Sequence, residues 1–126
     1  MKRIINTDKA PAAVGPYNQA VEVNNTLYVS GQIPLCPETG MFVSDTDVKK
    51  QAKQVLTNIG HILDAAGYSF DDVVKSTVLL KNISDFAAVN EVYATFFTGN
   101  LPARAAFEVA GLPLGALVEI ETIAAK

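Results

Sequence analysis

Residues 45–80 read DTDVKKQAKQVLTNIGHILDAAGYSFDDVVKSTVLL, a stretch in which a helix pattern is followed at once by a strand pattern. In its first part, up to Ala66, apolar residues recur every three or four positions, which predicts a helix with one apolar face. The final run, 73–80, is rich in β-branched residues and is apolar at both alternating sets of positions. This run predicts a central strand that is buried on both faces.

Polar residues and glycines mark where the helices begin and end. Thr46 or Ser44 is expected to cap the start of the first helix, and Gly67 is expected to end it in the left-handed conformation. Ser84 is expected to cap a second helix that stops at Gly99. One face of this second helix is apolar and contains Phe86, Val89, Tyr93, Phe96 and Phe97.

Further strands are predicted on either side of this stretch. Within 20–30, short apolar runs flank Asn24–Asn25, a pair that tolerates positive φ, so a hairpin is expected. Two final strands are expected over 104–110 and 117–124, joined across a turn that contains glycine and proline. The resulting order, β-β-α-β-α-β-β, predicts an α+β fold.

The length and composition of the chain favour self-association. With 126 residues the chain is long enough for one hydrophobic core and too short for two, so we expect a single domain over 1–126. Hydrophobic residues make up 49% of it, yet no apolar run approaches the roughly 18 residues that a membrane helix needs. Two helices can cover only one face of the sheet. The uncovered apolar face is therefore expected to pack against other copies of the chain.

Charge and cysteine content exclude several kinds of partner. The net charge is -3, and the basic residues are scattered rather than aligned in a stripe. Nucleic acid is therefore not expected as a main partner. The first residues lack the apolar core of a signal peptide, and a single cysteine, Cys36, leaves no internal disulfide. We therefore expect a cytoplasmic protein without a membrane partner.

Most of the common catalytic motifs are missing from the sequence. There is no dinucleotide fingerprint, no P-loop, no His-Glu-x-x-His and no calcium loop, so neither a nucleotide nor a metal site is predicted. His61, the only histidine, is predicted to lie on the solvent side of the first helix. Cys36 has no basic residue near it in sequence to activate its thiol, and neither residue is assigned a catalytic role. The aromatic residues at core spacing are interpreted as packing residues: Tyr28, Phe70, Phe86, Phe96 and Phe97.

Arg104 and Glu119 remain as candidate functional residues. Arg104 follows Pro102–Ala103 at the start of an apolar strand, and Glu119 lies on the partner strand beyond the turn. An arginine fork can bind a carboxylate through two parallel charge-assisted hydrogen bonds. Two interpretations are therefore open: an anion-binding site, or a structural ion pair of Arg104 with Glu119 or Glu121.

Several short segments, in order along the chain, resemble the Rid (reactive intermediate deaminase, YjgF-type) family. They are AAVGPY at 12–17, SGQIP at 30–34, PAR at 102–104 and VEIE at 118–121. The resemblance covers essentially the whole chain. Four ordered motifs in so short a chain are far more specific than any one of them alone.

The resemblance implies a fold, an assembly and a reaction. The implied fold is a chorismate-mutase-like α+β domain, and the implied assembly is a homotrimer whose active sites lie in clefts between subunits. The implied reaction is hydrolytic deamination, which converts 2-imino and 2-enamino acids, such as 2-iminobutanoate and 2-aminoacrylate, to 2-keto acids and ammonia. No metal and no cofactor are implied, because the imine is already electrophilic.

The resemblance also implies roles for individual residues. Arg104 is similar to the arginine that clamps the substrate carboxylate, and Glu119 to the glutamate that positions the attacking water. Tyr17, Ser30, Gly31 and Asn90 match family positions that line the pocket. Gly31 is expected to allow a close approach of the backbone.

This chain departs from its relatives beside the arginine, and one assignment has an alternative. Ser and Cys often follow the arginine in relatives, whereas this chain has Ala105 and Ala106. A thiol therefore takes no part there, and the backbone N–H of Ala106 is the expected donor to the substrate. Asn90 is expected either to face the pocket or to be a buried amide that ties helix to sheet.

Two other functions compete with deamination. A non-enzymatic trimer that binds keto acids would use the same arginine, but it would gain nothing from a carboxylate near its anionic ligand. A ribonuclease or translation inhibitor, an activity attached to some family members, is disfavoured by the acidic composition and by the lack of stacking aromatics beside basic residues. Because a binding protein has no use for the carboxylate of Glu119, this residue favours the hydrolytic enzyme over the non-enzymatic trimer.

Overall fold

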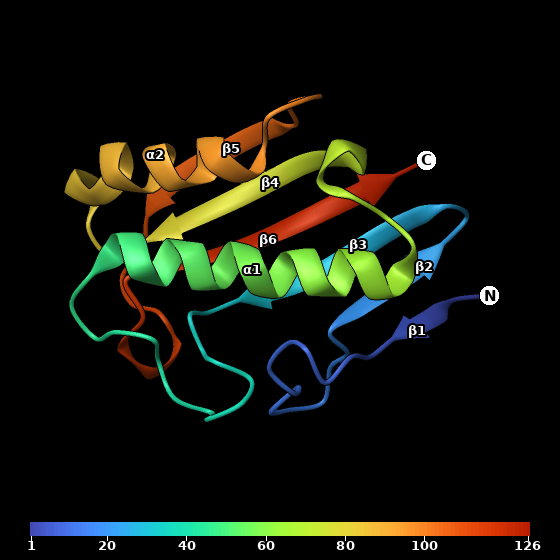
Figure 1. The fold of residues 1–126 in the computed structure, drawn as a ribbon, viewed down its shortest axis with the longest axis horizontal. Coiled ribbons are helices and arrows are strands. Elements are labelled where there is room, and N and C mark those ends of the chain that lie inside the picture. The colour runs from blue at the N-terminus through green and yellow to red at the C-terminus, as the bar shows by residue number, and fades with distance from the viewer.

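The computed structural model describes all residues, Met1–Lys126, which form one six-stranded sheet and a layer of two α-helices (Figure 1). The predicted order of elements is confirmed, with one strand added at the start. That strand has three residues, too few to show an alternating pattern of its own. The elements are β1 (Arg3–Ile5), β2 (Ala20–Val23), β3 (Thr26–Gln32), α1 (Val48–Ala66), β4 (Val73–Leu80), α2 (Phe86–Phe96), β5 (Ala103–Glu108) and β6 (Val118–Ala125).

Local backbone preferences explain the turns that the sequence predicts correctly. Asn24 and Asn25 have φ of 49° and 60° and join β2 to β3 as a hairpin. Gly67 ends α1 with φ of 83°, in the left-handed region that suits glycine. The start of α1 differs from the prediction, because Asp47 rather than Thr46 or Ser44 is the capping residue.

The start and end of α2 also differ from the prediction. Ser84 does not cap this helix; it lies in a short 3-10 turn, Ile83–Asp85, which leads directly into Phe86. The helix stops at Phe96, before Gly99. Gly99 instead lies close to the side chain of Asp71, because a Cβ at this position would lie 3.2 Å from Cγ of Asp71.

The sheet has the strand order β1-β2-β3-β6-β4-β5, in which β4 and β5 are parallel and all other neighbours are antiparallel. The prediction that the two final strands are partners is therefore wrong, because β4 lies between them. The physical reason is the helix α2, which carries the chain from the end of β4 back to the start of β5 and so makes these two strands parallel neighbours. Strand β6 then pairs with β3 and β4 in the interior of the sheet.

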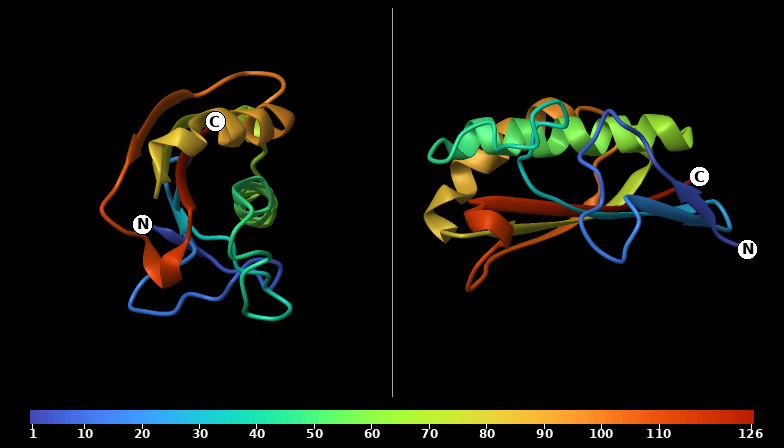
Figure 2. Two further views of the ribbon diagram at one scale, coloured as in Figure 1. Left: turned by 90° about the vertical axis from the view of Figure 1, so that its left-hand side faces the viewer. Right: turned by 90° about the horizontal axis from the view of Figure 1, so that it is seen from below.

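Both helices cover the same face of the sheet, which leaves the other face open (Figure 2). The buried core lies between the helices and the sheet and includes Leu56, Ile59, Leu80 and Ile120. Strand β4 is buried on this side only, because Val74 is 49% exposed. Burial on both faces is thus not reached within one chain.

Two aromatic side chains that were interpreted as packing residues are exposed instead. Tyr28 alternates with the buried Leu27 and Val29, so it lies on the open face and is 50% exposed. Phe86 begins α2 and is 36% exposed. The other three form the expected packing cluster, in which Phe70 contacts the rings of Phe96 and Phe97 at 5.6 and 5.1 Å between centroids.

Candidate functional site

Arg104 lies on the helix-covered side of the edge strand β5. Its register partner on β4 is Ser76, which is fully buried beneath the helices. The guanidinium Nη1 donates a hydrogen bond to Oδ1 of Asn90 at 2.6 Å. The same group lies over the rings of Tyr93 and Phe86, at 4.9 and 5.4 Å from their centroids. Three side chains of α2 therefore hold the guanidinium, and none of them is charged.

A pocket of about 560 Å³ opens beside Arg104. Its walls are mainly apolar, and Arg104 is its only charged residue. Such a pocket suits a small carboxylate that carries an apolar chain. It is lined by Asn90, Tyr93, Ala94, Phe97, Leu101, Pro102 and Arg104.

Asn90 is only half-buried, so the alternative of a buried amide is wrong. It lines this pocket, and its hydrogen bond to Arg104 also joins α2 to the sheet. The amide oxygen orients the arginine without neutralising its charge. The remaining N–H groups of Arg104 are free to donate to another acceptor, since no other hydrogen bond and no ion pair engages them.

Glu119 lies on the open face of the sheet, opposite to the face that carries Arg104. Its neighbours in β6, Val118 and Ile120, are fully buried on the helix side, so Glu119 points the other way. Its register partner on β4 is Leu79, three positions beyond the residue that pairs with Arg104. The structural ion pair of Arg104 with Glu119 or Glu121, one of the two interpretations open from the sequence, is therefore absent, and the chain's two ion pairs involve other residues.

The surroundings of Glu119 favour a proton acceptor of raised basicity. Its carboxylate makes no ion pair, and partial burial raises its pKa above the ordinary range of glutamate. The negative charge of Glu121 raises this pKa further. A carboxylate of this kind binds a proton more readily than an exposed one, as a general base should.

Gly31 makes room for the carboxylate of Glu119. A Cβ at position 31 would overlap Oε2 of Glu119 and would lie 3.0 Å from its Cδ. From the sequence, Gly31 is expected to allow a close approach of the backbone. The structure shows that the space beside Gly31 is occupied by Glu119, so this glycine acts on the position of the carboxylate.

Tyr17 and Ser30 lie on the same side of the molecule as Gly31. Tyr17 is 46% exposed and lines a pocket of about 350 Å³ together with Gly31 and Leu114. The hydroxyl of Ser30 donates to the carbonyl of Asn18 at 2.6 Å. Ser30 thereby holds the loop that carries Tyr17 against β3.

The backbone N–H of Ala106 points to the free edge of the sheet. The N–H of Val109 donates to the carbonyl of Leu80 on β4. Because successive backbone groups of a strand point to opposite sides, the N–H of Ala106 is directed away from β4. It is therefore available to a ligand or to another chain.

The structure brings the predicted residues together in two groups rather than one. Arg104, Asn90 and Ala106 belong to β5 and α2, whereas the other four belong to β3, β6 and the loop before β2. Sequence reasoning missed the contact of Tyr93 with Arg104. The spacing of Asn90 and Tyr93, three residues apart on one helix, places them on one face, but the same spacing is typical of core residues.

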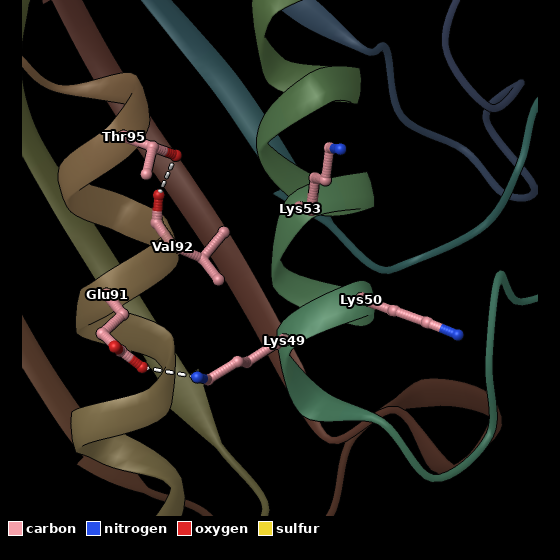
Figure 3. Close-up of a pocket in the computed structure, with 6 residues that line it drawn as sticks. All are labelled: Lys49, Lys50, Lys53, Glu91, Val92 and Thr95. Carbon is pink, nitrogen blue, oxygen red and sulfur yellow. Dashed lines mark hydrogen bonds and ion pairs between the residues drawn. The ribbon is translucent and has the colours of Figure 1, made fainter.

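A groove lies between α1 and α2 (Figure 3). None of the residues that line it belongs to either group. Lys49 bridges the helices through an ion pair with Glu91 at 2.5 Å. Lys50 points away from this ion pair (Figure 3). His61 is exposed on α1, as predicted, and the thiol of Cys36 contacts Oε1 of Gln54 at 3.7 Å.

Acidic, histidine and cysteine side chains nowhere form a cluster of three or more that could hold a metal ion. Neither helix has the length and hydropathy of a membrane span.

Known proteins resemble this chain over its whole length. The family model described as Endoribonuclease L-PSP matches residues 7–126. A protein of Mus musculus named 2-iminobutanoate/2-iminopropanoate deaminase is 55% identical over 100% of this chain and 93% of its own length. The human protein of the same name is 54% identical over 98% of this chain and 90% of its own.

Solved structures show the same fold. RidA from an Antarctic Psychrobacter is 52% identical, with a TM-score of 0.94 over 98% of this chain and 99% of its own. The Escherichia coli protein TdcF, solved with bound serine, is 43% identical, with a TM-score of 0.93 over 98% of both chains.

Proposed function

The chain belongs to the family described as Endoribonuclease L-PSP, the YjgF/Rid family, and we propose that it hydrolyses 2-imino and 2-enamino acids to 2-keto acids and ammonia. One observation carries this proposal: neither Arg104 nor Glu119 has an ionic partner within the chain. A cation and a carboxylate that do not neutralise each other are both available to a substrate. Close relatives across mammals bear the name of this deaminase.

The reaction follows from the chemistry of these two groups. Arg104 binds the substrate carboxylate and fixes the adjacent C2 carbon. The imine reacts as its protonated iminium form, and Glu119 accepts a proton from water as the water oxygen bonds to C2, so that the nitrogen becomes a neutral amine. Glu119 then returns this proton to the nitrogen, and the C2–N bond breaks to release ammonia. As the bond breaks, the proton of the C2 hydroxyl passes to Glu119 and then to solvent, and the C2 oxygen becomes the carbonyl of the keto acid.

The two faces of the sheet require an assembly for this reaction. Because Arg104 and Glu119 point to opposite sides of one sheet, we propose that each active site forms between two copies of the chain in a homotrimer. The open face presents apolar side chains such as Tyr28 and Phe107, which are 50% and 48% exposed. These side chains support packing against another copy.

The reaction is tested with imines made in place. A threonine or serine dehydratase generates 2-iminobutanoate or 2-aminoacrylate, and release of keto acid is followed with and without this protein. We expect the protein to accelerate release above the spontaneous rate. A protein that only bound keto acids would leave the rate unchanged, and that result would reject the proposal.

The shared site is tested by mixing two inactive variants. Arg104→Ala and Glu119→Gln subunits are refolded together in equal amounts, and each is also refolded alone as a control. If a site takes its arginine and glutamate from different subunits, about a quarter of the sites in random trimers carry both native residues. We expect about that fraction of native activity to return. No return of activity would show that both residues act from one chain.

The family description names an endoribonuclease, and RNA is the substrate that this alternative requires. The net charge of -3 and the scattered basic residues disfavour binding to a phosphate backbone. We therefore propose that RNA is not a main partner. Incubation with single-stranded RNA should leave it intact under conditions in which the imine is hydrolysed.

A further inference from the structure

The guanidinium of Arg104 is held in place although Arg104 itself is exposed on an edge strand. A free arginine side chain has many rotamers, and fixing it on binding a ligand lowers affinity. Here Asn90 and two rings restrict it before any ligand arrives. Of the two rings, Phe86 is 36% exposed, whereas Tyr93 is only 8% exposed. Tyr93 is therefore the more rigid support.

Tyr93 is fixed from one side by another aromatic ring. It stacks on Phe97, with centroids 4.3 Å apart and ring planes 22° from parallel. Phe97 in turn meets Phe70 edge to face at 5.1 Å. The support beneath Arg104 is thus continuous with the aromatic cluster of the core.

Buried hydroxyls line up with Arg104 on the helix-covered face of the sheet. Ser76 of β4 is the register partner of both Arg104 on β5 and Thr122 on β6, so these residues occupy three neighbouring strands in one line. The hydroxyls of Ser76, Thr122 and Tyr93 are buried, and none makes a hydrogen bond of ordinary distance and angle. Burial raises the pKa of Tyr93, and the nearby Ser76 hydroxyl and the charge of Arg104 offset part of that rise.

Packing alone does not account for these hydroxyls. Alanine, valine and phenylalanine would fill nearly the same volumes without a buried polar group, and unpaired buried hydroxyls destabilise a fold. The Ser76 hydroxyl lies close to that of Tyr93, and Ser76 is the register partner of Arg104. Its placement therefore points to a role in how Tyr93 is set beneath the guanidinium.

We infer that Tyr93 is a positioning residue for Arg104, and that the hydroxyl of Ser76 orients Tyr93 from the sheet. The ring supports the guanidinium through cation–π contact, and the hydroxyl of Ser76 limits sliding of the ring. Arg104 is thereby held in the orientation that meets a carboxylate with two parallel donors. This inference rests on the proposed function, in which Arg104 binds the carboxylate of the substrate.

The first experiment removes the ring. Tyr93→Leu is compared with Tyr93→Phe and with Phe96→Leu, a control on the same helix whose ring contacts Phe70 and not Arg104. Titration calorimetry with 2-oxobutanoate measures carboxylate binding, and the coupled imine assay measures kcat and KM. Sedimentation and thermal unfolding confirm that each variant is folded and assembled like the wild type at the assay temperature.

A graded loss is expected. Tyr93→Leu should weaken 2-oxobutanoate binding and raise KM about tenfold, because the cation–π support from the buried ring is lost, and kcat should change less than KM. Tyr93→Phe keeps the ring and should recover most of the affinity. Phe96→Leu should change neither quantity. Equal losses in Tyr93→Leu and Phe96→Leu, or none in Tyr93→Leu, would overturn the inference.

A second experiment addresses these hydroxyls. Ser76→Ala and Tyr93→Phe should each weaken 2-oxobutanoate binding by about two- to threefold. If the two hydroxyls act together, the double variant should lose no more affinity than the single variant with the larger loss. Losses that multiply would show that the hydroxyls act independently and would overturn this part. Wild-type protein that bound 2-oxobutanoate but did not hydrolyse imines would reject the proposed function, while the binding data would still decide the role of Tyr93.

Discussion

Replacing Gly31 with alanine should displace the carboxylate of Glu119 without destabilising the fold. A Cβ at position 31 overlaps Oε2 of Glu119 and lies 3.0 Å from its Cδ. Carbon atoms in ordinary contact are about 3.5–4.0 Å apart, so the carboxylate must move by about 1 Å. The backbone of residue 31 is not in the left-handed region, so alanine adopts its conformation without strain.

The expected result is an inactive protein that is still well folded. The displaced group is the end of a flexible side chain, so the free energy of unfolding should change by less than about 1 kcal/mol. A displacement of about 1 Å at a reacting group typically costs about 10²-fold in rate, so kcat for imine hydrolysis should fall by about that factor. Binding of 2-oxobutanoate should persist, because Arg104 binds the carboxylate and the atoms nearest to the added Cβ all belong to Glu119.

The assay compares the wild type, Gly31→Ala and Gly111→Ala under one set of conditions. Gly111→Ala is the matched control, because a Cβ there meets no atom within 4 Å and its φ is not positive. Urea unfolding gives stability, the coupled dehydratase assay gives kcat, and calorimetry gives 2-oxobutanoate affinity. Native kcat in Gly31→Ala would refute the assignment of Glu119 to the reaction. Loss of folding in Gly31→Ala would refute the claim that the carboxylate of Glu119 moves to make room for the Cβ.

Five further outcomes are expected. Glu119→Gln should lower kcat by roughly 10²-fold or more while keto acid binding survives, since it removes the base and keeps the size. In the wild type, kcat/KM should fall as pH drops through the raised pKa of Glu119, because only the ionised carboxylate accepts the proton; a pH–rate profile in which this limb persists in Glu119→Gln would contradict the assignment. A folded-state pKa above the unfolded value means that this ionisation destabilises the fold as pH rises, so Glu119→Gln should unfold at a higher temperature than the wild type at neutral pH, as calorimetry can show. Arg104→Lys should weaken 2-oxobutanoate binding and slow turnover steeply because the two-pronged donor geometry is lost, whereas Cys36→Ala should keep kcat/KM within about tenfold in the same assay.

Features that depend on neighbouring residues could be predicted from the sequence. The apolar spacing in 45–66 predicts the buried face of α1, because one turn of helix brings together residues three and four apart. The ends of β4 agree with the predicted strand 73–80. Helix caps were less predictable, because Ser44, Thr46 and Asp47 are all good capping residues and the local geometry selects one of them.

Features of the site that depend on register could not be predicted in the same way. Whether Arg104 and Glu119 share a face depends on the parity of two strands that are not neighbours, and no short-range pattern reports it. Strand β4 lies between β5 and β6 and so separates the two residues. The motif resemblance identified both of them but did not reveal that they point in opposite directions.

The sequence by itself determined the two helices, the hairpin at Asn24–Asn25 and the set of candidate residues, because periodicity, backbone preferences and ordered motifs are properties of short segments. The tertiary structure alone decided the strand order, the contact between Gly31 and Glu119, and the support of Arg104 by Tyr93. Each of these joins segments that are distant along the chain, and their contacts form only when long-range strand pairing sets which side chains face one another.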